Sequence, residues 1–447
     1  MTYIPHTPEN RATMLSGIGV SSIDELFEVI PEALRDPEIV LPPALSELEV
    51  MAELREMADR NANTHTSPCF LGAGAYNHFI PSAVSHIANR SEFVTAYTPY
   101  QPEIAQGTLQ VIFEYQSMIC ALTGMEVSNA SHYDGATSLA EAILMASNIA
   151  RGKRTRVLLN GGINPMYLQT VRTYTQGTDL ELESSPLLDG DVDALAERID
   201  GQTACVAVQL PDFAGRLFSL EKLADAAHRH GALLIVVQYP IALGMLKPAG
   251  AYGADIVVGD GQPLGNALSF GGPYLGYMAC RREHVRRLSG RLVGETVDTH
   301  GRRGFVLTLS AREQHIRREK ATSNICSNQG LNMLVAAMYM AAMGKNGLRQ
   351  VAELCYHKAH YAASEIAKLP GYRLVYDAPF FNEFIIECPA NAEALNKRLY
   401  EEYGIIGGYA LGSLEARLEH QMLVCVTEMN TADQIERLLA GLKEVVQ

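Results

Sequence analysis

The chain lacks a long apolar run, an excess of positive charge and any paired-cysteine motif. None of its apolar runs approaches the roughly 18 residues that a membrane span requires, and the N-terminal residues 1–8 lack the basic and apolar blocks of a signal peptide. The 447 residues carry a net charge of −14, which argues against nucleic acid and anionic membrane surfaces as partners. The eight cysteines form no C-x-x-C pair, a pattern typical of reduced, mostly buried thiols. These absences predict a cytoplasmic protein.

Lysine is scarce in this chain, and none is present in a glycine-rich turn where a catalytic lysine could be expected. The chain has nine lysines, and none lies in residues 248–319. Within this stretch a short apolar strand, residues 256–258, runs into a glycine-rich turn of the kind that presents a lysine to the aldehyde of pyridoxal phosphate. Here the turn carries Gln262 and Pro263. Because no other side chain supplies a primary amine, the pattern indicates an enzyme's architecture in a chain that is not an enzyme alone.

Three regions are predicted. Residues 1–65 form a helical arm, with cap spacing at 21–25 and helical apolar spacing at 45–58, and with too little core to stand alone. Residues 66–325 form a large α/β domain, because apolar strand-like runs alternate with amphipathic helices; the runs are 156–159, 205–208, 233–237, 256–258 and 275–278. Residues 326–447 hold a long linking helix, about 328–369, and a small α+β domain with strands at 372–376, 383–386 and 422–426 and helices at 391–403 and 431–445.

One glycine turn is a candidate anion site. Asp134, Gly135, Ala136 and Thr137 precede an uninterrupted helix over residues 138–150, and a helix N-terminus offers free N–H groups and a favourable dipole to a phosphate. The alternative is a plain helix cap made by Asp134 or Thr137, and spacing alone favours it.

Two further segments carry candidate site residues. In the first, prolines hold residues 97–104 extended while Tyr97, Tyr100 and Gln101 offer hydroxyl and amide groups, which suits an active-site loop or a tyrosine-rich subunit contact. In the second, small polar residues could bind phosphate oxygens or simply begin a helix; they are Thr322, Ser323 and Asn324. His357 and His360 lack a third ligand, so no metal site is predicted.

These motifs resemble one family along essentially the whole chain. The segments 97–103, 129–131, 134–137, 259–265, 270–273 and 321–326 are similar to the P-protein of the glycine cleavage system, in particular to the alpha subunit (subunit 1) type of the two-subunit bacterial form. The resemblance implies an α/β fold of type I among pyridoxal-phosphate-dependent transferases, with a mostly parallel seven-stranded sheet covered by helices on both faces. It also implies decarboxylation of glycine and transfer of the aminomethyl group to the lipoyl arm of the H-protein.

The resemblance further implies a homologous beta subunit that carries the Schiff-base lysine and the pyridoxal phosphate, in an α2β2 heterotetramer. Tyr97, Tyr100 and Gln101 would then wall a shared site, residues 322–324 would lie towards the partner's phosphate, and residues 134–137 would be a degenerate cup. Where catalytic relatives have a His-Lys pair, this chain has Gln262-Pro263. Where they place an Asp beside the pyridine nitrogen, it has Gln238-Tyr239.

Two alternatives remain open. The chain could be a self-sufficient pyridoxal-phosphate lyase or transferase in which Lys247 or Lys320 swings into the site. It could also be a purely structural or regulatory partner that contributes no residue to a site.

Overall fold

The computed structural model describes residues 5–444, apart from 36, 322, 324 and 326–328. The chain divides into two compact units, Met1–Ala62 and Asn63–Gln447, which we call the N-terminal segment and the body. The finer boundary near residue 325 stays a prediction. No helix in the described part of the chain combines the length and the apolarity that a membrane crossing requires.

The N-terminal segment contains helices but no interior. Its helices are α1 (Pro8–Ile18) and α2 (Glu47–Asp59), with short 3-10 turns at Asp24–Phe27 and Glu32–Leu34. Capping boxes start both α-helices, Thr7 with Asn10 and Ser46 with Glu49. None of the described residues from 5 to 62 is buried. The segment is therefore helical by local capping rather than by packing.

The body is built on a seven-stranded sheet. Its strands are β1 (Val127–Ser128), β2 (Arg156–Leu159), β3 (Glu181–Ser184), β4 (Thr203–Leu210), β5 (Leu233–Gln238), β6 (Ile256–Asp260) and β7 (Gly276–Cys280). Their order is β1-β7-β6-β5-β4-β2-β3. Strands β3, β2, β4, β5 and β6 are parallel, whereas β7 pairs antiparallel with both β6 and β1. The predicted mostly parallel, seven-stranded sheet is confirmed.

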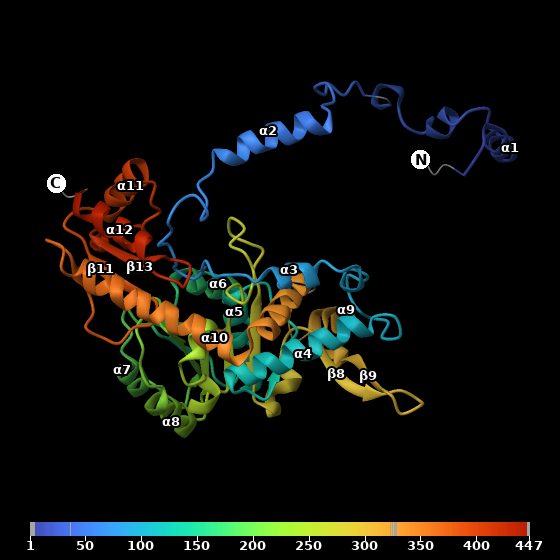
Figure 1. Cartoon of the computed structure of the whole chain (residues 1–447). Helices are drawn as coiled ribbons and strands as arrows, with labels where there is room; N and C mark the ends of the chain where they lie inside the picture. Colours follow the sequence, from blue (N-terminus) through green and yellow to red (C-terminus); the bar gives the residue numbers. More distant parts are fainter. Residues whose placement is uncertain (1–4, 36, 322, 324, 326–328, 445–447) are drawn as a thin grey trace. The chain divides into compact units, whose positions relative to one another are not determined.

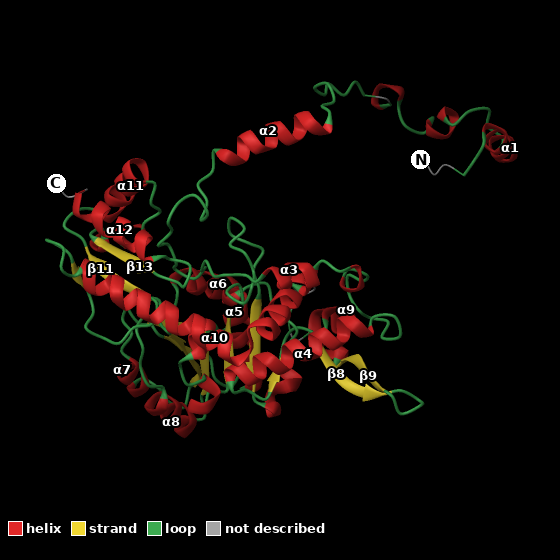
Figure 2. Cartoon of the chain, in the orientation of Figure 1, coloured by secondary structure: helices red, strands yellow, loops and turns green. Residues whose placement is uncertain are grey.

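Alternate strand residues pack against helices on opposite faces of this sheet (Figure 2). Val206, Val208 and Val236 lie in a cluster with α4 (Gln106–Thr123), α8 (Glu221–His230) and α10 (Gly330–Ile366). Cys205, Ala207, Ile235 and Val237 lie in the other cluster, with α5 (Gly135–Ile149) and α6 (Pro165–Thr175). The period of two in side-chain direction thus produces a sheet that is buried on both faces, which is why its strands are continuously apolar. Short helices α3 (Ser82–Ala88) and α7 (Val192–Glu197) complete this part of the body.

A hairpin outside the main sheet was not predicted. It pairs β8 (Leu292–Val297) with β9 (Arg303–Thr308), and Figure 1 shows its tip projecting from the body. Phe305 of β9 packs on Phe113 of α4 with ring centroids 5.3 Å apart. A short helix, α9 (Gln314–Arg317), follows the hairpin.

The C-terminal part is a small antiparallel sheet with two helices, as predicted. Its strands are β10 (Arg373–Leu374), β11 (Glu383–Glu387), β12 (Tyr409–Ala410) and β13 (Gln421–Cys425), in the order β10-β11-β13-β12. The helices are α11 (Ala392–Tyr403) and α12 (Ala432–Glu444), and α10 leads into this part from the large sheet (Figure 1). Isolated bridges, Cys69 to Ile406 and Arg216 to Phe380, connect the two parts.

Candidate functional site

A small cavity lies where a doubly wound sheet usually binds its ligand, at the carboxyl ends of the central parallel strands. Its walls come from the ends of β5 and β6 and from the segment before α3, and they include Tyr76, Tyr167, Tyr239, Asp260 and Pro263. Its volume is about 30 Å³. Pockets for small molecules typically measure about 300–1,000 Å³, so this one has room for water but not for a cofactor.

At the N-terminus of α5, beside this cavity, two backbone N–H groups donate to the chain's own carboxylates. The Asp134 carboxylate accepts a hydrogen bond from the Thr137 N–H at 2.7 Å, and Thr137 Oγ1 accepts one from the Asp134 N–H at 3.1 Å. This capping box is the helix-cap alternative that the sequence left open. The Gly135 N–H donates to Asp260 Oδ2 at 3.1 Å. Burial raises the pKa of Asp260 to about 7.

The turn that lacks a lysine is fixed by Gln262. Its side-chain amide exchanges two hydrogen bonds, both 2.9 Å long, with the backbone of Tyr76. Its own N–H donates to Asp260 Oδ1 at 2.8 Å. The Tyr76 ring lies against that of Tyr239, with centroids 4.4 Å apart. Gln262 therefore fixes Tyr76, one ring of the aromatic pair that lines the cavity.

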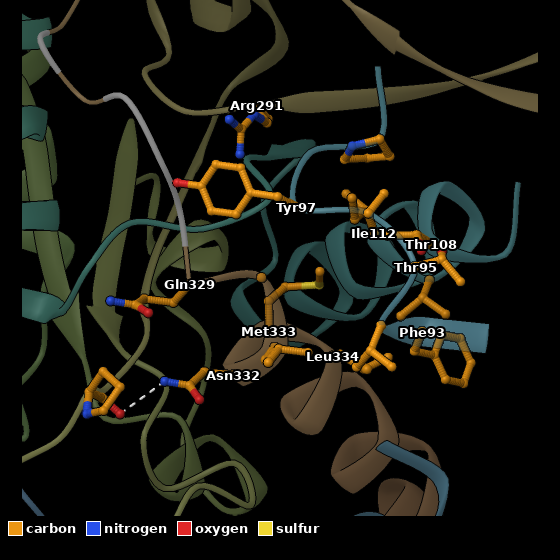
Figure 3. Close-up of a pocket in the computed structure, with 17 residues that line it drawn as sticks. Phe93, Thr95, Tyr97, Thr108, Ile112, Arg291, Gln329, Asn332, Met333 and Leu334 are labelled. Atoms are coloured by element: carbon orange, nitrogen blue, oxygen red, sulfur yellow. Dashed lines mark hydrogen bonds between the residues drawn. The ribbon is translucent and has the colours of Figure 1, made fainter. Parts of the chain in front are cut away.

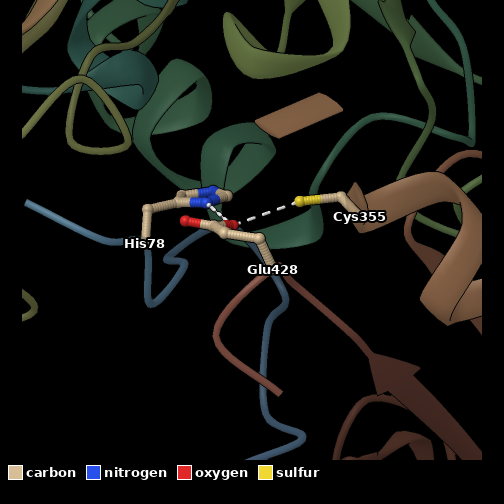
Figure 4. A group of neighbouring side chains, drawn as sticks. All are labelled: His78, Cys355 and Glu428. Carbon is tan, nitrogen blue, oxygen red and sulfur yellow. Dashed lines mark hydrogen bonds and ion pairs between the residues drawn. The ribbon is translucent and has the colours of Figure 1, made fainter. Parts of the chain in front are cut away.

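A polar group made of His78, Cys355 and Glu428 (Figure 4) contacts the Tyr239 hydroxyl through His78. The Tyr239 hydroxyl is hydrogen-bonded to His78 Nε2, and His78 Nδ1 lies 2.7 Å from Glu428 Oε2. The Glu428 carboxylate also accepts hydrogen bonds from the Phe79 N–H at 2.7 Å and from the Cys355 thiol at 3.3 Å. Burial opposes ionisation of Glu428, but the hydrogen bond from His78 and its charge keep the pKa of Glu428 below the ordinary value.

This group was not predicted from the sequence. The ligand atoms of His78, Cys355 and Glu428 lie within 4.8 Å of one another, a spacing that also admits a metal ion. Each of these atoms already has a hydrogen-bond partner, so the group is satisfied without one. No sequence signal could have found it, since His78 and Glu428 are 350 positions apart. The sequence argued against His360 as a zinc ligand. In the structure its ring stacks on that of Phe380, with centroids 3.9 Å apart.

The tyrosine loop lies elsewhere, on the rim of a larger cavity (Figure 3). Tyr97 is 83% exposed and lines this cavity of about 510 Å³ together with Arg291 and Asn332. Asn332 is held in place because its side-chain amide donates to the Pro273 carbonyl at 2.9 Å. Arg291 brings a positive charge that the sequence analysis did not single out. The cavity thus combines an apolar floor, an exposed phenol and a guanidinium.

The two predicted loops meet at a second hollow. Tyr100 lines it together with His315 and Ile325, and its volume is about 570 Å³. The rings of Tyr100 and His315 contact edge to face, with centroids 5.8 Å apart. Ser323 Oγ donates to Glu141 Oε1 of α5 at 2.6 Å.

The other predicted residues of these two loops are Gln101, Thr322 and Asn324. Gln101 is exposed. Thr322 and Asn324 lie outside the described residues.

The displaced-lysine alternative finds no support in the contacts of Lys247. Its ammonium lies 3.4 Å from Glu221 Oε1 and 4.0 Å from the centre of the Tyr252 ring. Glu221 begins α8, on the sheet face opposite α5. Lys247 is thus engaged away from the turn at Pro263.

Comparison with known proteins gives consistent results over the full chain. The family model of the glycine cleavage system P-protein matches residues 1–442. The probable glycine dehydrogenase (decarboxylating) subunit 1 of Thermomicrobium roseum is 53% identical over 447 residues, covering 99% of each chain. That of Desulforamulus reducens is 51% identical over 448 residues, again covering 99% of each.

Solved structures agree. A crystal structure of glycine decarboxylase (P-protein) of the glycine cleavage system, in inhibitor-bound form, superposes with a TM-score of 0.89 at 44% identity and full coverage of both chains. Glutamate decarboxylase from Lactobacillus brevis gives a TM-score of 0.69 at 14% identity, covering 92% of this chain and 94% of that one, which shows the fold alone. The predicted fold of type I among pyridoxal-phosphate-dependent enzymes is confirmed.

Proposed function

Because the chain belongs to the glycine cleavage system P-protein family, as a member of the subunit 1 type of glycine dehydrogenase (decarboxylating), we propose that it walls a site completed by a second subunit. The second subunit is a homologous beta chain whose lysine holds pyridoxal phosphate, and the two assemble as an α2β2 heterotetramer in the cytoplasm. Glycine is decarboxylated there, and the aminomethyl group passes to the lipoyl arm of the H-protein.

One contrast supports this proposal. The chain's own cofactor position retains a cavity of about 30 Å³, whereas Tyr97 stands 83% exposed beside one of about 510 Å³. Tyrosines are enriched where proteins bind partners, because the ring contributes apolar contact area and the hydroxyl a hydrogen bond. The chain's own cofactor position is filled, whereas the cavity beside Tyr97 is open. This combination fits a subunit that contributes residues to a cofactor site in its partner.

The proposed roles follow from the chemistry of the side chains. Pyridoxal phosphate supplies the electron sink for loss of carbon dioxide when it is bound in the partner. The hydroxyls of Tyr97 and Tyr100 and the amide of Gln101 orient the substrate by hydrogen bonds and exclude water. We assign Thr322, Ser323 and Asn324 as donors to the partner's phosphate, because their side chains carry hydroxyl and amide groups. In this role the Ser323 hydroxyl exchanges its bond to Glu141 for one to the phosphate.

The test of this proposal is reconstitution with the lysine-bearing homologue. We expect the two chains to co-purify and glycine–bicarbonate exchange to appear only in the mixture. The isolated chain should show no borohydride-reducible adduct of pyridoxal phosphate on a lysine. Exchange by the isolated chain, lost in Lys247→Ala, would instead establish the self-sufficient enzyme.

The wall residues are tested by removing single hydroxyls. Tyr97→Phe and Tyr100→Phe should each lower the exchange rate of the reconstituted complex about tenfold or more while the complex stays intact on gel filtration. Tyr400→Phe is the matched control, because Tyr400 is also exposed but lies on α11. Full exchange by both rim variants in an intact complex would support the purely structural partner.

A further inference from the structure

The fold implies a pyridoxal phosphate site in this chain as well, and the residues present do not fit one. Such a site needs a lysine amine, an acid beside the pyridine nitrogen and free N–H groups for a phosphate. The first two positions carry Pro263 and Tyr239. The third is the N-terminus of α5, which begins at Gly135.

Asp260 occupies the place of an anion at this helix end. It lies at the end of β6, 125 positions from Gly135 in the sequence. One of its carboxylate oxygens accepts from the Gly135 N–H at 3.1 Å, and the other accepts from the Gln262 N–H at 2.8 Å. The side chain of Asp260 is therefore bound by one backbone donor at the helix start and by one in its own turn, and the first of these is a donor that an external anion would use.

The space around Asp260 is closed as well. A Cβ added at Gly135 would lie 2.5 Å from Tyr167 Oη and 2.8 Å from the Asp260 nitrogen. The aromatic pair of Tyr76 and Tyr239 fills the region towards Pro263, and Gln262 fixes Tyr76 by its two backbone hydrogen bonds. Asp134 adds a second carboxylate that would repel a phosphate.

We propose that Asp260 is an internal replacement for the cofactor phosphate, which keeps the N-terminus of α5 closed to external anions. The carboxylate satisfies the Gly135 N–H, which an empty site would leave unpaired, and buried N–H groups without partners are rare in folded proteins. The site is thus a closed structural element of this chain. This inference concerns the single chain and does not depend on the identity of its partner.

The experiment opens the site by removing the carboxylate. Thermal unfolding of the full-length chain is measured with and without inorganic phosphate, for the wild type and for Asp260→Ser. Wild type should show no phosphate-dependent shift. Asp260→Ser frees the donors and the space, so its melting temperature should rise by about 2 °C or more with phosphate, saturably.

Two controls separate this effect from general destabilisation. Asp260→Asn keeps the side-chain volume, so the site should remain closed to phosphate even if the variant is less stable. Asp255→Ser removes a buried carboxylate just before the other end of β6, where it pairs with His228 and Arg281, and should gain no phosphate dependence. The proposal is overturned if phosphate stabilises the wild type saturably. It is also overturned if phosphate does not stabilise a folded Asp260→Ser. Calorimetric titration of Asp260→Ser with phosphate distinguishes local binding from a bulk salt effect.

Discussion

Buried carboxylates mark the places where this chain holds polar groups in an apolar interior. Glu383 on β11 is one: it accepts hydrogen bonds from the Ala73 N–H and the Tyr76 hydroxyl, both at 2.7 Å. Through Tyr76 it connects the small sheet to the aromatic pair described above. Burial raises the pKa of Glu383 from 4.5 to about 7. An ionised carboxylate is therefore disfavoured in the fold relative to the unfolded chain.

This raised pKa predicts a pH dependence of stability. Since the folded value lies above the unfolded one, the contribution of Glu383 is fully present below pH 4.5 and is lost as the pH rises through about 7. The full loss amounts to roughly 3 kcal/mol, at 1.36 kcal/mol per unit of pKa shift, and roughly 2–3 kcal/mol of it falls between pH 5 and pH 8. Glu383→Gln cannot ionise, so its free energy of unfolding relative to wild type should improve by that amount between pH 5 and pH 8. Urea unfolding at the two pH values measures this difference.

Glu387→Gln provides the control for this measurement. It lies on the same strand, but its side chain is 29% exposed. Its stability relative to wild type should be nearly the same at both pH values. If Glu383→Gln behaves like Glu387→Gln, the Glu383 carboxyl is not held neutral in the fold.

Single residues were predictable from the sequence only where a local pattern marked them. Asp260 lies in the turn to which the missing lysine drew attention. Its hydrogen bond with the Gly135 N–H could not be predicted, because the sequence does not show that β6 ends beside α5. Tyr76 and His78 gave no signal at all, because their partners Gln262 and Glu428 are 186 and 350 positions away. Contacts over such separations are set by topology, and topology is what a single sequence shows least directly.

At the level of elements, the long helix α10 contains a break with a defined cause. Gly344 has φ 59° and ψ −175°, a conformation available essentially to glycine only. No atom lies within 4 Å of a Cβ added there, so the constraint is on the backbone rather than on space. Gly344→Ala should therefore lower the free energy of unfolding by roughly 1–3 kcal/mol, measured by urea denaturation.

The neighbouring Gly347 tests this interpretation. It has no positive φ, and a Cβ there would meet the side chain of Met343, whose Cβ lies at 3.1 Å and whose Cε lies at 3.2 Å. Ala also gains about 1 kcal/mol in helix propensity over Gly, so Gly347→Ala should cost less than Gly344→Ala. Equal costs for the two substitutions would show that α10 straightens readily and that the break is not required.

The elements themselves were predictable in proportion to their burial. Strands β5 and β6 are covered on both faces, so their sequences are continuous apolar runs that local reasoning identifies. The edge strand β3 reads Glu-Leu-Glu-Ser, and the β8–β9 hairpin is exposed over most of its outer half. Neither carries a strong pattern, because half-exposed strands tolerate polar residues, and both were missed.

For the whole molecule, the sequence separated an arm from a body because apolar residues are distributed differently in the two. In the body they form four buried clusters. In the N-terminal segment they stay exposed; Val29, Val40 and Leu48 are 91%, 87% and 80% exposed, respectively. This distribution predicts an arm that packs on something else, and the sequence of the arm does not identify the covering surface.

The contrast predicts different unfolding behaviour for the two units. Among the described residues of the segment 1–62 none is buried, and the 13 residues of α2 are near the lower limit for a helix stable in water, about 12–15 residues. The circular dichroism of a peptide of residues 1–62 at 222 nm should therefore change gradually on heating, at any peptide concentration at which it stays monomeric. The fragment 63–447, which holds all four clusters, should unfold cooperatively under the same conditions. A sharp transition in the monomeric peptide would show that the segment folds by itself, and would remove the need for a covering surface.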